Sequence, residues 1–278
     1  MHSFAKAVAF TMAYAVVASI ASAQALPTAQ PGMITIVREQ VKVGHNADHA
    51  KVEASYAAAS EKAKVPEFYL ALNSMTGPNE AVFISPFASH TALGEAMKRD
   101  GGNAPLQAEF SRLSKLDADH INGFTVMQAV ARPDLSHGAF PDFAMVRFQE
   151  ITTYRVRIGH EAEFEAAAKA YISAANRAAS HDAFRLYQVV AGMVSPSYLL
   201  LRSHEKFAEF DQSGPTRDAV FAAMNSEERA AWAAGPNAIN NYDTQRYSVS
   251  PTMTYTNKDA RAKDPAFWNP KKAAITAP

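Results

Sequence analysis

The sequence predicts an α+β fold in which one small module occurs twice. Residues 41–48 return as residues 156–163, and the paired positions are identical or chemically similar at all but one pair. The match continues at the same offset as far as Tyr56 and Tyr171. A repeat of this length indicates two copies of one supersecondary unit, which bury their apolar faces against each other.

The first predicted element of each copy is a strand. Residues 33–43 alternate between two faces. One face carries valines, including Val43, together with Glu39, and the other carries Arg, Gln and Lys. Residues 146–158 alternate in the same way in the second copy. This period of two is typical of a sheet that is packed on one face and polar on the other.

The remaining elements follow in the same order in both copies. Gly44 and Gly159 end the first strands, and helices rich in the strong helix formers Ala, Glu and Lys come next. In the first copy we predict a helix at 47–64, strands at 68–75 and 81–87, helices from Ser89 and at 104–120, and a strand at 124–131. In the second copy we predict a helix at 162–179, strands at 183–190 and 198–202, helices from Ser203 and at 216–234, and a strand at 242–249.

This order, β-α-β-β-α-β, is ferredoxin-like. An antiparallel sheet with helices on one face needs a partner for its other face, and here the second copy supplies one. We therefore predict two ferredoxin-like repeats that form one intramolecular barrel. The repeats are residues 33–131 and 145–256, with a linker at 132–144, a lead-in at 24–32 and a C-terminal tail at 257–278.

The N-terminus has the three regions of a secretory signal peptide in the right order. Lys6 provides the positive charge, residues 7–20 are an uncharged apolar run, and the small residues 21–23 form a cleavage site. We expect residues 1–23 to be removed and the protein to be periplasmic or secreted. No later run of eighteen apolar residues occurs, so we expect no membrane association after cleavage.

Composition excludes several kinds of function. Lys and Arg total 27, as do Asp and Glu, so the formal net charge is zero, and nucleic acid is disfavoured as a partner. The chain has no cysteine, which excludes disulfides and thiol catalysis. Its stability must therefore come from the hydrophobic core.

The element order and the strand-Gly-His-helix and Ser-His-helix junctions resemble the dimeric α+β-barrel superfamily. That group includes antibiotic-biosynthesis monooxygenase-like and NIPSNAP-like domains, in which two ferredoxin-like modules enclose a cavity. The resemblance covers roughly residues 33–131 and 145–249, and it implies a tandem version of that dimer. No catalytic motif matches residue by residue, so the resemblance assigns no catalytic residue, and fold alone does not name a function.

Polar residues on the predicted strands are the main candidates for a ligand site. They are Arg38, Gln40, Arg147, Gln149, Arg155, Arg185, Tyr187 and Arg202. Buried arginines need anionic or hydrogen-bonding partners. One interpretation is internal pairing with Glu39, Glu150 or Asp243. The other is a polar or anionic ligand held between the two sheets.

The repeated histidines admit a functional and a structural interpretation. His45 and His160 could act as paired bases or metal ligands, but an imidazole that satisfies a free backbone group at a helix start explains them more simply. His45 and His49 share a helix face, yet a metal site needs three or four ligands, and no carboxylate stands at a recognisable spacing. We therefore expect no metal site.

Two classes of function remain. The first is a binding module that holds a small polar or anionic molecule between the sheets. The second is a cofactor-independent monooxygenase or a haem-binding enzyme, as the resemblance implies. We predict no cofactor, with haem left open because its axial ligand is commonly a histidine; the candidates are His90, His120, His181 and His204. We expect a monomer that forms a pseudo-dimer, or a homodimer.

Overall fold

The computed structural model describes residues 26–270, so the signal peptide predicted at 1–23 and the last eight residues lie outside it. Its centre is a closed antiparallel barrel in the order β1-β3-β2-β8-β5-β7-β6-β4. The strands are β1 Met33–Val41, β2 Leu70–Ser74, β3 Glu80–Phe87, β4 Ile121–Ala131, β5 Phe148–Val156, β6 Arg185–Ala191, β7 Ser197–His204 and β8 Ile239–Val249. The α+β class with an antiparallel sheet is confirmed.

Each half of the chain contributes four neighbouring strands, and the two sets meet at two short junctions. Residues 72–74 of β2 pair with 247–249 of β8, and 128–131 of β4 pair with 187–191 of β6. The pairing within each half is longer, since Met33 to Val41 of β1 pair along β4. Closure leaves no sheet edge open to another chain.

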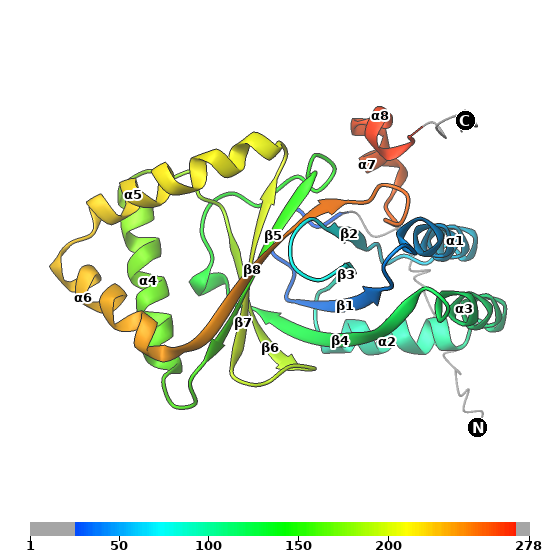
Figure 1. Cartoon of the computed structure of the whole chain (residues 1–278), viewed down its shortest axis with the longest axis horizontal. Helices are drawn as coiled ribbons and strands as arrows, with labels where there is room; N and C mark the ends of the chain where they lie inside the picture. Colours follow the sequence, from blue (N-terminus) through cyan, green and yellow to red (C-terminus); the bar gives the residue numbers. More distant parts are fainter. Residues whose placement is uncertain (1–25, 271–278) are drawn as a thin grey trace, which may run out of the picture.

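Helices cover the barrel on two opposite sides (Figure 1). On the outer face of the first half lie α1 Asn46–Ala63, α2 His90–Gly101 and α3 Ala104–Asp117, and on that of the second half lie α4 Glu161–Arg177, α5 Ser213–Ala223 and α6 Ser226–Ala234. Short 3-10 turns lie at Pro133–Leu135, Phe207–Gln212 and Gly235–Ala238, and the tail forms α7 Lys258–Lys263 and α8 Pro265–Trp268. Within residues 26–270, no helix has both the length and the apolar character needed to cross a membrane.

The predicted helix at Ser89 is confirmed, whereas the one at Ser203 is wrong. The hydroxyl of Ser89 accepts a hydrogen bond from the backbone N–H of Ala92, which caps α2. Ser203 instead lies in β7 and donates to the side-chain oxygen of Gln149. Its hydroxyl is therefore used across the sheet, and a 3-10 turn replaces the helix.

The helix predicted at 216–234 is in fact two helices. The chain leaves helical geometry at Met224, and Asn225 caps α6 by accepting from the backbone N–H of Glu228. The side chain of Glu228 accepts from the backbone N–H of Asn225 in return, which completes a capping box. This local signal outweighs the continuous helix propensity of the segment.

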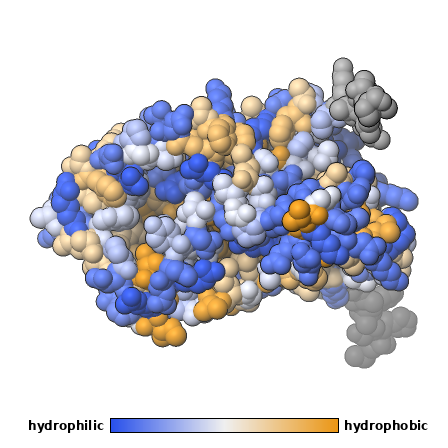
Figure 2. Space-filling view, in the orientation of Figure 1, coloured by the Kyte–Doolittle hydropathy of each residue, from blue (hydrophilic) through white to orange (hydrophobic). Residues whose placement is uncertain are grey.

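The barrel interior is apolar at its centre, contrary to the expected polar interior. Residues that alternate inward along the strands form one cluster, which includes Ile34, Ile36, Leu72, Val82, Met127, Ile151, Leu199, Tyr247 and Val249. A second cluster fills the space between the second half's sheet and its helices. Polar inward-facing residues are confined to the two ends of the barrel. Figure 2 shows that the outer face turned to the viewer is mostly hydrophilic, with apolar residues in small groups.

The packed face of the first strand also ends earlier than predicted. Val43 is 91% exposed because β1 stops at Val41 and the chain turns at Gly44, whose φ is +86°. Gly159 has the same φ at the equivalent corner. This left-handed backbone conformation favours glycine, so the repeated Gly-His corners have a geometric cause.

Candidate functional site

A cavity lies at one end of the barrel and is lined by residues of both halves. Its empty space is about 740 Å³, which includes the part open to solvent. The inward-facing strand residues that line it are Ile34, Leu70, Ile84, Pro86, Gln149, Arg185, Tyr187, Leu201 and Ser203. Most of this lining is apolar, as is typical of sites for small organic molecules.

Segments outside the predicted repeats complete the cavity wall. The lead-in contributes Leu26 and Pro27, the linker contributes Phe140 and Phe143, and the C-terminal tail contributes Trp268. These segments therefore narrow the open end of the barrel into a partly enclosed pocket.

The tail is fixed to the protein's own surface. The indole N–H of Trp268 donates to the carbonyl oxygen of Ala144 at 2.9 Å, and this side chain is buried. The guanidinium of Arg147 pairs with Asp264 at 2.5 Å and lies 3.8 Å from the centre of the Phe267 ring. Arg147 thus holds the tail in place and is not free to bind a ligand.

Trp268→Ala is expected to lower the free energy of unfolding by about 3–5 kcal/mol, because it removes a buried aromatic side chain and its hydrogen bond. Chemical denaturation measures this loss. As a control, Phe207→Ala removes an aromatic side chain that is 53% exposed, and it should cost much less. Equal losses in the two variants would show that the tail is not anchored through Trp268.

The cavity contains a buried cation without a carboxylate partner. Arg185 is 9% exposed, and its guanidinium donates to the carbonyl oxygens of His137, Phe184 and Gly138 at 2.6–2.8 Å. Burial lowers the pKa of Arg185 below its usual value, although an arginine stays charged at neutral pH. None of the described residues that line the cavity is an aspartate or glutamate. The positive charge is therefore not neutralised within the cavity.

Three further lining residues have a polar group without a partner. The side-chain nitrogen of Gln149 and the hydroxyls of Tyr69 and Thr256 are buried, and none has a hydrogen-bond partner among residues 26–270. The oxygen of Gln149 accepts from Ser203 at 2.8 Å, so this amide is oriented with its nitrogen unused. Buried groups of this kind are rare in folded proteins and call for a partner.

The cavity lining offers no ordinary general base. Among the described lining residues the ionisable side chains are Arg185 and two tyrosines, with no aspartate, glutamate, histidine or lysine. Burial raises the pKa of Tyr187 above its usual range, so its phenol stays protonated at neutral pH. The cavity can therefore donate hydrogen bonds and present positive charge, but it does not accept a proton readily.

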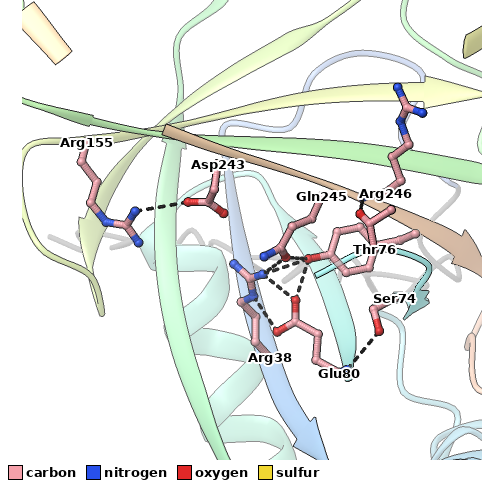
Figure 3. A network of polar contacts seen from close by, with 9 residues as sticks. Arg38, Ser74, Thr76, Glu80, Arg155, Asp243, Gln245 and Arg246 are labelled. Atoms are coloured by element: carbon pink, nitrogen blue, oxygen red, sulfur yellow. Dashed lines mark hydrogen bonds and ion pairs between the residues drawn. The ribbon is translucent and has the colours of Figure 1, made fainter. Parts of the chain in front are cut away.

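The other end of the barrel holds a closed polar network, which Figure 3 shows. The guanidinium of Arg38 makes two bonds to Glu80, the shorter at 2.5 Å, and also reaches the side-chain oxygen of Gln245 at 2.5 Å. The hydroxyl of Tyr247 lies 2.8 Å from Arg38 and 2.6 Å from Glu80. Because Gln245 and Tyr247 belong to the second half, this network joins the two halves.

The predicted ligand residues thus separate into distinct groups. Gln149, Arg185 and Tyr187 line one cavity. Arg38 and Arg155 pair with carboxylates of the protein itself, Arg38 with Glu80 and Arg155 with Asp243 at 3.2 Å.

The remaining two predicted residues, Gln40 and Arg202, lie outside the cavity. Gln40 is exposed. Arg202 lies on the helix-covered face of β7, where it pairs with Asp182 at 2.9 Å. Burial raises the pKa of Asp182, whereas the guanidinium of Arg202 lowers it, and the net result is a lowered pKa.

The described lining of the cavity offers a haem no histidine ligand. None of the four histidines considered as axial ligands lines it, nor does any other histidine, cysteine or methionine among the described residues. His204, for instance, stacks on Phe210 on the outer side of the sheet, with ring centres 4.4 Å apart. A haem in this cavity would have no histidine to bind its iron.

The repeated histidines do not cap their helices either. Neither His45 nor His160 makes a side-chain capping bond. Instead, Nδ1 of His45 lies 3.0 Å from Nδ1 of His120, and Nδ1 of His160 lies 2.5 Å from Glu163. The expected role at the helix start is therefore wrong.

Thr256 and Trp268 are among the cavity residues that the sequence did not indicate. The aromatic pair at 267–268 was a signal that the tail docks, but nothing in the local sequence indicated where.

Comparison with known proteins finds similarity in structure rather than in sequence. No protein-family model matches the chain, and no curated protein matches it. An anthrone oxidase-like protein has a similar structure, with a TM-score of 0.56, 11% identity, and coverage of 84% of this chain and 97% of that one. A candidate monooxygenase from Fusobacterium nucleatum subsp. nucleatum has a TM-score of 0.52 and 9% identity, with coverage of 79% of this chain and 93% of that one. A mutant chlorite dismutase from Candidatus Nitrospira defluvii has a TM-score of 0.50 and 10% identity, with coverage of 81% of this chain and 94% of that one. At these identities the likeness shows a fold of the dimeric α+β-barrel type.

Proposed function

We propose that the barrel is a binding module for a small, largely apolar molecule that carries one anionic group. The observation that carries this proposal is the buried guanidinium of Arg185, which has carbonyl oxygens as partners but no carboxylate. A carboxylate ligand would neutralise this charge in surroundings where a charge-assisted hydrogen bond is strong. The apolar strand residues, with Phe140 and Trp268, would bury the body of the ligand.

The unpaired polar groups support the same assignment. The free nitrogen of Gln149 can donate a second hydrogen bond to an acceptor beside Arg185, and the hydroxyl of Thr256 can donate a third. Donors without acceptors suit an acceptor-rich ligand, and a carboxylate accepts several hydrogen bonds.

Binding is favoured over catalysis because the lining lacks a group that takes up a proton at neutral pH. The second candidate is a cofactor-independent monooxygenase, which rests on fold likeness to a candidate monooxygenase and an anthrone oxidase-like protein. Fold alone supports it weakly. Oxygen uptake during incubation with a bound phenolic ligand would favour that candidate over a pure binding module.

We also propose that one duplicated, NIPSNAP-like module gave rise to both halves, so that one chain makes the barrel that two chains make in dimeric relatives of the fold. The equivalent strand orders of the two halves support this. The protein would then act as a monomer or as a homodimer. The composition of residues 1–23 supports export to the periplasm or secretion.

A matched pair of probes tests the binding proposal. Medium-chain and aromatic carboxylates should bind, and each should bind at least about tenfold more tightly than its neutral primary amide, because one charge-assisted bond contributes about 1.5–3 kcal/mol. Trp268 lines the cavity, so its fluorescence reports on occupancy. Arg185→Gln should remove the preference for the carboxylate.

Two further variants complete this test. Arg155→Gln changes an arginine at the opposite end of the barrel, where it pairs with Asp243 at the surface, and binding should stay unchanged. Should Arg185→Gln misfold, Thr256→Val keeps the shape of the side chain and removes only a donor, and it should weaken binding severalfold. Carboxylates that bind wild type no better than their amides would overturn the proposal.

A further inference from the structure

A second polar cluster lies outside the barrel, between β1 and the helices α1 and α3. Glu39 projects from the helix-covered face of β1, His49 and Glu53 come from α1, and Asp117 ends α3. One nitrogen or oxygen atom of each residue lies within 4.8 Å of those of the other three. We expected no metal site from the sequence, but Glu53 lies four residues after His49 on the same helix, and the fold adds Glu39 and Asp117 from two other elements.

The imidazole of His49 is buried and oriented. It is 2% exposed, and its Nδ1 lies 2.8 Å from an oxygen of Asp117. With the Nδ1 proton donated to this carboxylate, the other ring nitrogen, Nε2, carries a lone pair. Nε2 has no hydrogen-bond partner among residues 26–270 and lies 3.6 Å from an oxygen of Glu39. That oxygen is also buried without a partner.

The cluster contains no cation that balances its carboxylates. Among the described residues, Glu39 and Asp117 have His49 as their ion-pair partner, and no arginine or lysine pairs with Glu53.

The other ionisable groups near the cluster are tyrosines. Tyr56 and Tyr69 have pKa values raised first by burial and then by the charge of Glu53. Neither supplies a positive charge.

The second half shows that this corner of the fold does not need polar groups. Counted from the strand-ending glycines, the positions of Glu39, His49 and Glu53 correspond to Tyr154, Phe164 and Ala168. Tyr154 and Phe164 pack against each other with ring centres 5.4 Å apart. An apolar solution therefore exists for the same strand–helix corner, and the first half retains buried acids despite their desolvation cost.

We propose that Glu39, His49 and Glu53 bind a divalent transition-metal cation of the Zn²⁺ class, with Asp117 positioning the imidazole. One histidine nitrogen and two carboxylates form a ligand set that suits Zn²⁺ or Mn²⁺, whereas Mg²⁺ prefers oxygen ligands alone. Ligand distances of about 2.0–2.2 Å place ligand atoms within about 4.4 Å of one another. Small side-chain adjustments from the present separations are therefore sufficient.

The test uses the tag-free full chain, stripped with a chelator and titrated with Zn²⁺ by calorimetry. Wild type should bind one equivalent, and Mg²⁺ should not compete. Glu53→Gln and His49→Phe should each weaken binding at least about a hundredfold, because each removes one of three ligands. Asp117→Asn should weaken it about 10–100-fold, as is usual for a group that orients a ligand.

The control is the exposed pair His160 and Glu163, which lies in the second half at the equivalent corner. The double variant His160→Gln/Glu163→Gln should bind Zn²⁺ like wild type. Visible absorption of the Co²⁺ form gives an independent reading, since its bands should change in Glu53→Gln and not in the control. Equal Zn²⁺ affinity in wild type and Glu53→Gln, or no binding by folded wild type, would overturn the proposal. The cavity ligand plays no part in this test, so the two proposals fail separately.

Discussion

Arg38→Met is expected to lower the free energy of unfolding by about 3–5 kcal/mol. Glu80 is 7% exposed, and removing its partner leaves a buried negative charge without compensation. The loss should extend to the contact between the two halves, since Arg38 also binds Gln245 and Tyr247. Urea denaturation of the purified variant measures the change.

The chain offers a matched control for this prediction. Arg155→Met removes an arginine from the pair with Asp243, whose side chains are 36% and 43% exposed, and it should cost at most about 1 kcal/mol. The double variant Arg38→Met/Glu80→Met should recover much of the stability, because no unpaired charge remains. A loss with Arg38→Met no larger than with Arg155→Met would mean that the network contributes little.

Chelator-treated protein is expected to lose stability as the pH rises from about 5 to 9. The pKa of Glu53 is raised from 4.5 to about 9 in the folded protein. Between these values the folded state keeps a proton that the unfolded chain has released, so the free energy of unfolding falls with pH. The slope approaches about 1.4 kcal/mol per pH unit for one group, and the total loss is several kcal/mol.

Glu53→Gln should remove most of this pH dependence, because glutamine resembles the protonated acid and does not ionise. At pH 8 the chelated variant should therefore be more stable than chelated wild type. Denaturation curves at several pH values compare the two, with Glu163→Gln as the control at an exposed acid. If the slopes of wild type and Glu53→Gln coincide, Glu53 does not hold a proton in the folded protein.

The elements with strong local signals could be predicted from the sequence. Period-two alternation located β1 and β5, and Gly44 and Gly159 marked their ends because the positive φ at those corners favours glycine. The match between the copies also indicated equivalent strands in both halves. The helix from Ser203 was wrong because a serine that suits a helix cap can equally well donate across a sheet, as it does to Gln149.

The candidate cavity could be predicted only in part. Alternation placed Gln149, Arg185 and Tyr187 on inward faces, and these three residues do line the cavity. It could not decide which arginines pair with carboxylates of the protein, although Asp243 was among the partners considered for Arg155, or show that Trp268 lines the cavity, because both depend on contacts between distant segments. The cluster around His49 is the extreme case, since its four residues come from three elements.

Native mass spectrometry of the protein, purified gently from the organism that makes it, shows directly whether the barrel holds an acidic ligand. We expect wild type to retain a small acidic molecule, which denaturation releases, and Arg185→Gln purified in the same way to carry none. The retained molecule should return to the stripped wild type and not to the variant. Retention of the same molecule by both proteins would contradict this expectation. So would a wild type that is purified without any bound molecule and binds no added carboxylate.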